Sequence, residues 1–171
     1  MSVVGIVEPT QFLTFHLDKE VFAIDISKIK EVLEFTDLTH IPSTPDFMCG
    51  VINLRGSVVP IIDLRLKFGM ANGKRTVNTC FIIIDVKQEN GTTVIGAMAD
   101  SVKEVMELNP DQIEPPPKVG TGLRADYICG MGKLYDNFVI LLDTDKIFSV
   151  HELNTIRNTS VPLPNQHERA A

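Results

Sequence analysis

The sequence predicts an all-β protein built from two small barrels that arose by duplication and pack against each other. Short stretches of strand length, rich in apolar and β-branched residues and bounded by turn residues, follow one another to about residue 143. The order of these stretches occurs twice, because Lys-Glu-Val at 30–32 returns at 103–105 and Cys49-Gly50 returns at 129–130. A unit of roughly 65–70 residues that occurs only twice indicates a pair of barrels and not a solenoid. Each unit alone would bury a marginal core, so we expect the two to pack together.

The first copy spans residues 10–77 and follows a short arm, residues 1–9, which we expect to be mobile. Residues 11–17 and 21–26 favour two strands joined by a polar turn. Residues 27–35 fit either one helical turn or a third strand, and the pattern does not decide between them.

A hairpin over residues 50–64 is the strongest local signal in the chain. Its second half is apolar at almost every position, as in a strand covered on both faces. Gly56-Ser57 fits a two-residue type II′ turn between the strands. Asn53 and Arg55 are two positions apart, so they are expected to project from the same face of the first strand.

The second copy spans residues 78–153 and repeats this order of strands. It ends in a predicted short helix that starts at Thr144 and places Ile147, Phe148, Val150 and Leu153 on one face. Residues 154–171 are polar and contain two prolines, so we expect a disordered tail there.

Composition excludes several classes of function. The chain is 44% hydrophobic and 22% charged, as in an ordinary globular protein. A net charge of −6 without a run of Lys or Arg argues against a nucleic-acid partner. No apolar run reaches the ~18 residues that a membrane span needs. Three widely spaced cysteines, Cys49, Cys80 and Cys129, fit the cytosol and the role of small buried hydrophobic residues.

The residue pattern contains no catalytic constellation. None of the four histidines has a cysteine or carboxylate at metal-ligand spacing, and no glycine-rich phosphate loop is present. Asp63 and Asp143 occupy equivalent strand ends, where repeated residues usually serve the fold. We therefore expect a protein that is not an enzyme and that binds neither a metal nor a cofactor.

Three motifs carry a resemblance to a known family: I-D-I-S-K-I-K-E-V, then I-P-S-T-P-D-F, then G-V-I-N-L-R-G-S-V-V-P-I-I-D-L-R-L-K-F. Together, over about residues 10–153, the chain resembles the CheW family of bacterial chemotaxis adaptors. The resemblance implies two SH3-like five-stranded barrels. It also implies a non-enzymatic scaffold that couples the cytoplasmic tips of methyl-accepting chemoreceptors to the regulatory domain of the histidine kinase CheA. Such a protein would be cytoplasmic and recruited to receptor arrays at the inner face of the membrane.

The resemblance also implies a binding surface. Matched motif by motif, the receptor contact falls on Ile29, Glu31, Gly50, Asn53 and Arg55. Kinase contacts are expected at the end of the second barrel, without particular residues.

Two alternatives to this interpretation stay open. Arg55 could form an intramolecular salt bridge that closes its barrel. The position equivalent to Arg55 in the second copy holds Tyr135. A function of a different class, a small-ligand sensor, would use the seam between the barrels as an apolar pocket.

Overall fold

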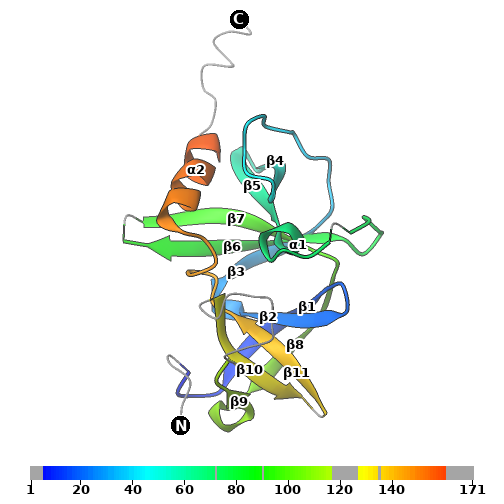
Figure 1. Cartoon of the computed structure of the whole chain (residues 1–171), viewed down its shortest axis with the longest axis vertical. Helices are drawn as coiled ribbons and strands as arrows, with labels where there is room; N and C mark the ends of the chain where they lie inside the picture. The colour runs from blue at the N-terminus through cyan, green and yellow to red at the C-terminus, as the bar shows by residue number, and fades with distance from the viewer. Residues whose placement is uncertain (1–5, 72, 90, 117–126, 135, 161–171) are drawn as a thin grey trace, which may run out of the picture.

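The computed structural model describes residues 6–71, 73–89, 91–116, 127–134 and 136–160. Within these residues the chain forms eleven strands, two short 3-10 turns and two helices (Figure 1). The elements are β1 (Thr10–Leu17), β2 (Glu20–Asp25), η1 (Ile26–Lys28), β3 (Ile29–Glu34), β4 (Met48–Leu54), β5 (Ser57–Asp63), α1 (Leu64–Lys67), β6 (Cys80–Gln88), β7 (Gly91–Ala99), β8 (Ser101–Leu108), η2 (Pro110–Gln112), β9 (Ile113–Glu114), β10 (Ile128–Leu134), β11 (Asn137–Leu142) and α2 (Val150–Ser160).

The strands form two curled sheets, which confirms the all-β prediction. The five-stranded sheet has the order β3-β6-β7-β5-β4, and we call it barrel 1. The six-stranded sheet has the order β8-β1-β2-β11-β10-β9, and we call it barrel 2. Figure 1 shows barrel 1 above barrel 2. The sixth strand of barrel 2 is the two-residue β9, and its counterpart in barrel 1 is the isolated bridge between Thr39 and Val51.

The strand pairing corrects the expected division into barrels of residues 10–77 and 78–153. Barrel 1 contains the β6–β7 hairpin of the second copy, and barrel 2 contains the β1–β2 hairpin of the first. The N-terminal hairpin of each copy is therefore part of the barrel that contains the remaining strands of the other copy. The connections explain this, because only η1 separates β2 from β3 and only Asp100 separates β7 from β8. After such short connections the next strand leaves the sheet of its own hairpin and continues in the other.

The two copies remain equivalent in register after the exchange. β5 pairs in parallel with β7 at Ile61↔Gly96, and β11 pairs in parallel with β2 at the equivalent Leu141↔Ala23. Gly50 in β4 follows a β-bulge, and Gly130 follows the same bulge in β10. The internal repeat in the sequence therefore corresponds to a repeat in three dimensions.

Three apolar clusters form the core of the protein, and the largest of them joins the two barrels. One cluster fills barrel 1 around Phe81 and Ile83, and another fills barrel 2 around Phe12 and Leu141. The largest cluster lies between the two sheets and draws on β1, β2, β6 and β7. We call it the inter-barrel core. Because burial of one large apolar side chain stabilises a fold by about 1.5–3 kcal/mol, this shared core makes neither barrel independent of the other.

Helix α2 begins later and ends later than the sequence predicts. It begins at Val150 rather than Thr144, after a capping box in which Ser149 Oγ accepts from the Glu152 N–H at 3.0 Å and Glu152 Oε1 accepts from the Ser149 N–H at 2.8 Å. Leu153 and Ile156 are fully buried in the inter-barrel core. Residues 154–160 of the expected tail are thus helical, because two apolar residues one turn apart anchor them, and residues 161–171 lie outside the described residues.

Two further expectations concern the start of the chain. Of the arm at 1–9 only residues 6–9 are described, and Ile6 packs against the barrel 2 cluster. Residues 27–35 contain both alternatives, since the turn η1 leads directly into β3.

Candidate functional site

The hairpin between β4 and β5 presents Arg55 from a type I′ turn. Leu54 pairs with Ser57, so the two loop residues are Arg55 and Gly56, with φ angles of 52° and 89°. The expected type II′ turn at Gly56-Ser57 is therefore wrong. The cause is local, because Asn53 Oδ1 accepts a hydrogen bond from the Gly56 N–H at 2.8 Å and holds the loop one residue earlier. Asn53 thus shapes the turn, and Arg55 does not lie on its strand face.

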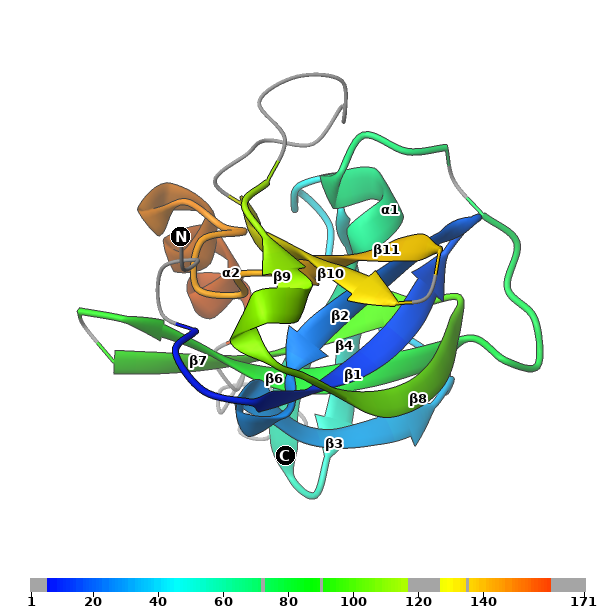
Figure 2. The same cartoon turned by 90° about the horizontal axis from the view of Figure 1, so that it is seen from below.

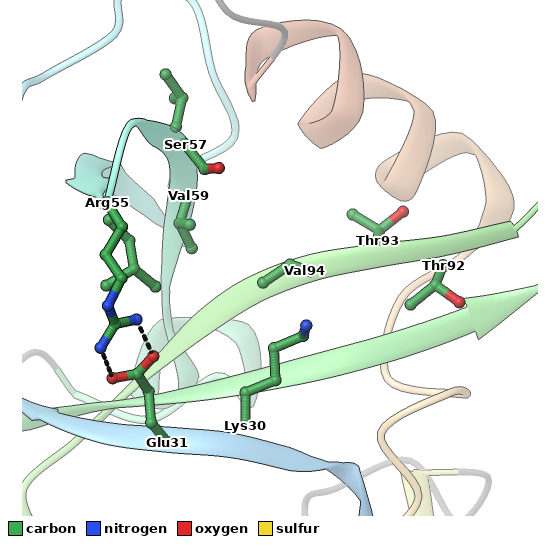
Figure 3. A pocket seen from close by; sticks show the side chains of 10 residues that line it. Lys30, Glu31, Arg55, Ser57, Val59, Thr92, Thr93 and Val94 are labelled. Atoms are coloured by element: carbon green, nitrogen blue, oxygen red, sulfur yellow. Dashed lines mark hydrogen bonds and ion pairs between the residues drawn. The ribbon is translucent and has the colours of Figure 1, made fainter.

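Arg55 forms a bidentate ion pair with Glu31 of β3. Nη1 donates to Oε2 at 2.5 Å and Nη2 donates to Oε1 at 2.9 Å (Figure 3). The hydrogen bonds from Arg55 lower the pKa of Glu31, and those to Glu31 raise the pKa of Arg55. β3 and β4 are the two outer strands of their sheet, so the pair spans the open edge of barrel 1. This is the intramolecular salt bridge that the sequence left open as an alternative.

A β-bulge places Glu31 at this edge. The register of β3 against β6 shifts between Ile29 and Glu31, which makes Lys30 the extra residue. Lys30 is exposed, whereas Glu31 lies opposite Ile83 of the barrel 1 cluster. The carboxylate therefore sits at the mouth of the barrel, within reach of the hairpin turn.

The ion pair forms one wall of a groove of about 560 Å³ in barrel 1. β3 contributes Lys30 and Glu31, the β4–β5 hairpin contributes apolar and hydroxyl side chains, and β7 contributes three consecutive residues. Its lining consists of Lys30, Glu31, Leu54, Arg55, Ser57, Val58, Val59, Thr92, Thr93 and Val94. The groove thus combines a charged rim with a partly apolar floor.

The structure brings together two of the five sequence-predicted contact residues, Glu31 and Arg55. Ile29 is half-buried against the inter-barrel core. Gly50 is buried, has φ of +152°, and leaves no room for a side chain next to the Thr39 carbonyl. Ile29 and Gly50 therefore contribute mainly to packing in this structure, and Asn53 to the turn.

Sequence reasoning missed a pair of exposed valines. Val32 of β3 is 43% exposed and Val105 of β8 is 47% exposed, and the two are equivalent in the repeat. Both valines belong to the repeated Lys-Glu-Val triplet. The sequence shows this repeat, but it does not show that the two valine side chains are exposed. In Figure 2, β3 and β8 run along the same side of the molecule. Each of these two outer strands therefore carries the same alternation of exposed lysine, valine and glutamate.

The described residues contain no group of three His, Cys, Asp or Glu side chains that could hold a metal ion. All three cysteines are free, and burial raises the pKa of Cys49 and Cys129 to about 11. In the described part of the chain, no helix has both the length and the apolar character needed to cross a membrane.

Replacing Glu31 by glutamine should lower the temperature of unfolding at neutral pH and have no effect in strong acid. The folded-state pKa of Glu31 lies below its usual value of 4.5, so the ion pair stabilises the fold above that value. Its contribution is lost as the pH falls through the folded-state pKa. Thermal unfolding from neutral pH to about pH 3 measures this.

Glu104→Gln is the matched control for that experiment. Glu104 holds the same register in the second copy, and no ion pair forms with it among the described residues. A difference between Glu31→Gln and the parent that stays constant across the whole pH range would contradict the role of the pair.

The described residues thus form two fused small barrels with a charged groove at the open edge of one, which is the architecture of a double-barrel domain. A family model described as CheW-like domain matches residues 11–152, and the chain belongs to this family.

Similar proteins agree with this assignment. Chemotaxis protein CheW of Klebsiella aerogenes is 38% identical over 150 residues, covering 88% of each chain. Chemotaxis protein CheW of Treponema pallidum is 31% identical over 156 residues, covering 88% of this chain and 89% of the relative. The crystal structure of scaffolding protein TtCheW from Thermoanaerobacter tengcongensis has a TM-score of 0.76 and 32% identity, covering 84% of this chain and 90% of that one.

Proposed function

We propose that this protein is a cytoplasmic chemotaxis adaptor that couples chemoreceptor tips to the histidine kinase CheA at receptor arrays. The observation that carries the proposal is the surface around β3. There the Glu31–Arg55 pair fixes a guanidinium whose side chain is still 71% exposed, and Val32 stands exposed on the same strand. The names of the similar proteins support the pathway.

The receptor contact is proposed for this β3 surface because it offers both affinity and orientation. A guanidinium has five N–H donors, and the ion pair with Glu31 uses two of them. The remaining donors can bind acceptors on a receptor tip. Val32, between exposed Lys30 and Glu34, offers apolar area flanked by opposite charges. Glu31 holds the guanidinium in place before binding, which reduces the entropy lost on association.

An adaptor needs a second surface for the kinase, and we place the CheA regulatory domain at the end of barrel 2. β8 displays Lys103, Val105 and Glu107 as β3 displays its own set, so a second exposed strand face is present there. Simultaneous occupancy of the two faces raises the local concentration of one partner near the other, and the adaptor itself needs no chemistry.

Replacing Arg55 by alanine should weaken receptor binding about thirtyfold, because loss of an interfacial charge leaves its partner group unpaired. The measurement is titration of a receptor-tip fragment into the folded variant, with thermal unfolding recorded on the same sample. Binding of the CheA regulatory domain should be unchanged.

Lys133→Ala is the matched control, because Lys133 forms an ion pair with Glu114 at 2.6 Å in barrel 2. Receptor affinity should be unaffected in that variant. If Arg55→Ala lowers the unfolding temperature but leaves receptor affinity intact, Arg55 serves only the fold and the proposed contact is wrong.

The small-ligand sensor receives no comparable support. It would need an apolar cavity in the seam between the barrels, and the side chains of the inter-barrel core occupy that seam.

A further inference from the structure

β5 and β7 diverge at their N-terminal ends. The two strands are parallel, and their ladder begins at Ile61↔Gly96 and ends at Asp63↔Met98. β5 itself begins at Ser57 and β7 at Gly91, so the first residues of each strand lie outside the ladder. Figure 3 shows the strands separating toward these ends. We call the space between residues 57–60 and 91–95 the fork.

Pro60 favours this separation of β5 from β7. β5 is an inner strand, between β4 and β7, and proline has no N–H to donate to a ladder. The second copy provides an internal comparison, because it has Ile140 at the position of Pro60. Ile140 pairs with Phe22 of β2, whereas the ladder of barrel 1 starts one residue later, at Ile61. The edge of β5 that faces β7 therefore behaves like an edge strand at Pro60.

The fork coincides with the groove of about 560 Å³. That volume lies in the range of about 300–1,000 Å³ that ligand sites occupy. Val59 and Val94 supply apolar surface from the two diverging strands, and Ser57 and Thr92 supply hydroxyl groups near the open end (Figure 3). Two strand edges that flank an apolar groove suit an extended peptide, because the peptide can hydrogen-bond with backbone groups on either side.

The charge of the groove favours an acidic occupant. Its lining contains Lys30 and Arg55 but only one acid, Glu31, whereas the whole protein has a net charge of −6. Arg55 is bound to Glu31, and Lys30 forms an ion pair with Asp85 whose N–O distance of 3.9 Å is too long for a hydrogen bond. Because the Lys30 side chain is also 51% exposed, its ammonium group can donate hydrogen bonds to a carboxylate in the groove.

We propose that the fork is a binding site for an extended segment of a partner protein. Such a segment places apolar side chains against Val59 and Val94, adds its backbone to the diverging strands, and directs a carboxylate toward Lys30. This site shares Lys30, Glu31 and Arg55 with the β3 surface that we assign to the receptor tip, but its floor lies between β5 and β7. It gives barrel 1 the capacity to bind a linear motif in addition to the folded partners of an adaptor.

The test uses the full-length chain and a synthetic probe, the acetylated and amidated peptide Val-Thr-Val-Thr-Asp. Saturable binding should shift the amide NMR signals of residues 57–59 and 92–94. A version of the peptide methylated on its backbone nitrogens should bind at least about tenfold more weakly, because it cannot donate to the strand edges. Equal binding of both peptides, signals shifted elsewhere, or no saturable binding would each overturn the proposal.

Protein variants test the proposed charge contact. Lys30→Gln should weaken binding of the probe about two- to fivefold, in line with an exposed ion pair. Lys103→Gln is the matched control, because Lys103 holds the same bulge position in β8 and should leave binding unchanged. If both variants weakened binding of the probe equally, Lys30 would not be part of the binding site. Because the probe contains no receptor sequence, its failure would leave the proposed adaptor function untouched.

Discussion

Gly50→Ala should lower the free energy of unfolding by about 3 kcal/mol or more, because two penalties add at this position. Gly50 has φ of +152°, a conformation that residues with a Cβ rarely adopt. A Cβ would also lie 2.6 Å from the carbonyl oxygen of Thr39, which is backbone and cannot rotate away. Thr39 exchanges two hydrogen bonds of 2.9 Å with Val51, so the clash would break the bridge beside β4.

Two other glycines make this prediction specific. Gly69 has φ of +75° with open space around it, so Gly69→Ala should cost only about 1 kcal/mol. A Cβ at Gly96 would meet the end of the Ile61 side chain, which can shift, so an intermediate loss is expected. Urea denaturation of the three variants gives the ranking. Equal losses for Gly50→Ala and Gly69→Ala would show that the contact with Thr39 does not matter.

The sequence was sufficient for the fold class and for the equivalence of the two copies. Strand patterns depend on local sequence, so a repeated order of strands can be recognised without knowing which strands pair in the folded protein. The exchange of hairpins could not be predicted in the same way. β1 and β2 have the same pattern whether they pair with β3 or with β8, and the choice depends on a connection as short as η1.

The candidate site shows the same limit. The family motif identified Glu31 and Arg55, but it did not reveal that the two bind each other across 24 residues of sequence. The turn was placed one residue too late because the side chain of Asn53, and not the glycine alone, decides which residues form the loop. Exposure of Val32 and Val105 depends on their position in outer strands, which only the sheet order reveals.

Lys67 has an environment that the sequence did not suggest. Its side chain is 7% exposed, and its ammonium group lies 5.0–5.6 Å from the ring centres of Phe47, Tyr127 and Phe148. It donates to the Tyr127 hydroxyl at 2.9 Å and forms an ion pair with Glu152 of α2 at 3.2 Å. The aromatic residues follow the repeat, because Phe47–Phe148 and Phe68–Tyr127 are equivalent ring contacts, at 6.0 and 5.9 Å.

The lysine itself breaks this symmetry, since the equivalent residue of the second copy is Ile147. An apolar residue is therefore compatible with the second position, whereas in the first a buried cation joins α1 to α2. Burial of a charge is costly unless it is paired, and removal of one partner leaves the other without compensation. The ion pair and the ring contacts together make Lys67 a polar link between barrel 1 and the C-terminal helix.

Lys67→Ala should lower the free energy of unfolding by about 3 kcal/mol, through a cavity among the three rings and an unpaired Glu152. The loss should be visible locally, as faster amide hydrogen exchange along α2. Lys67→Met keeps most of the volume and should recover about half of the loss, while Glu152→Gln should cost only about 1 kcal/mol because it can still accept a hydrogen bond. If Lys67→Met were as damaging as Lys67→Ala, the charge would dominate. If Lys67→Ala left both the unfolding free energy and the exchange of α2 unchanged, the link between α1 and α2 would not stabilise the protein.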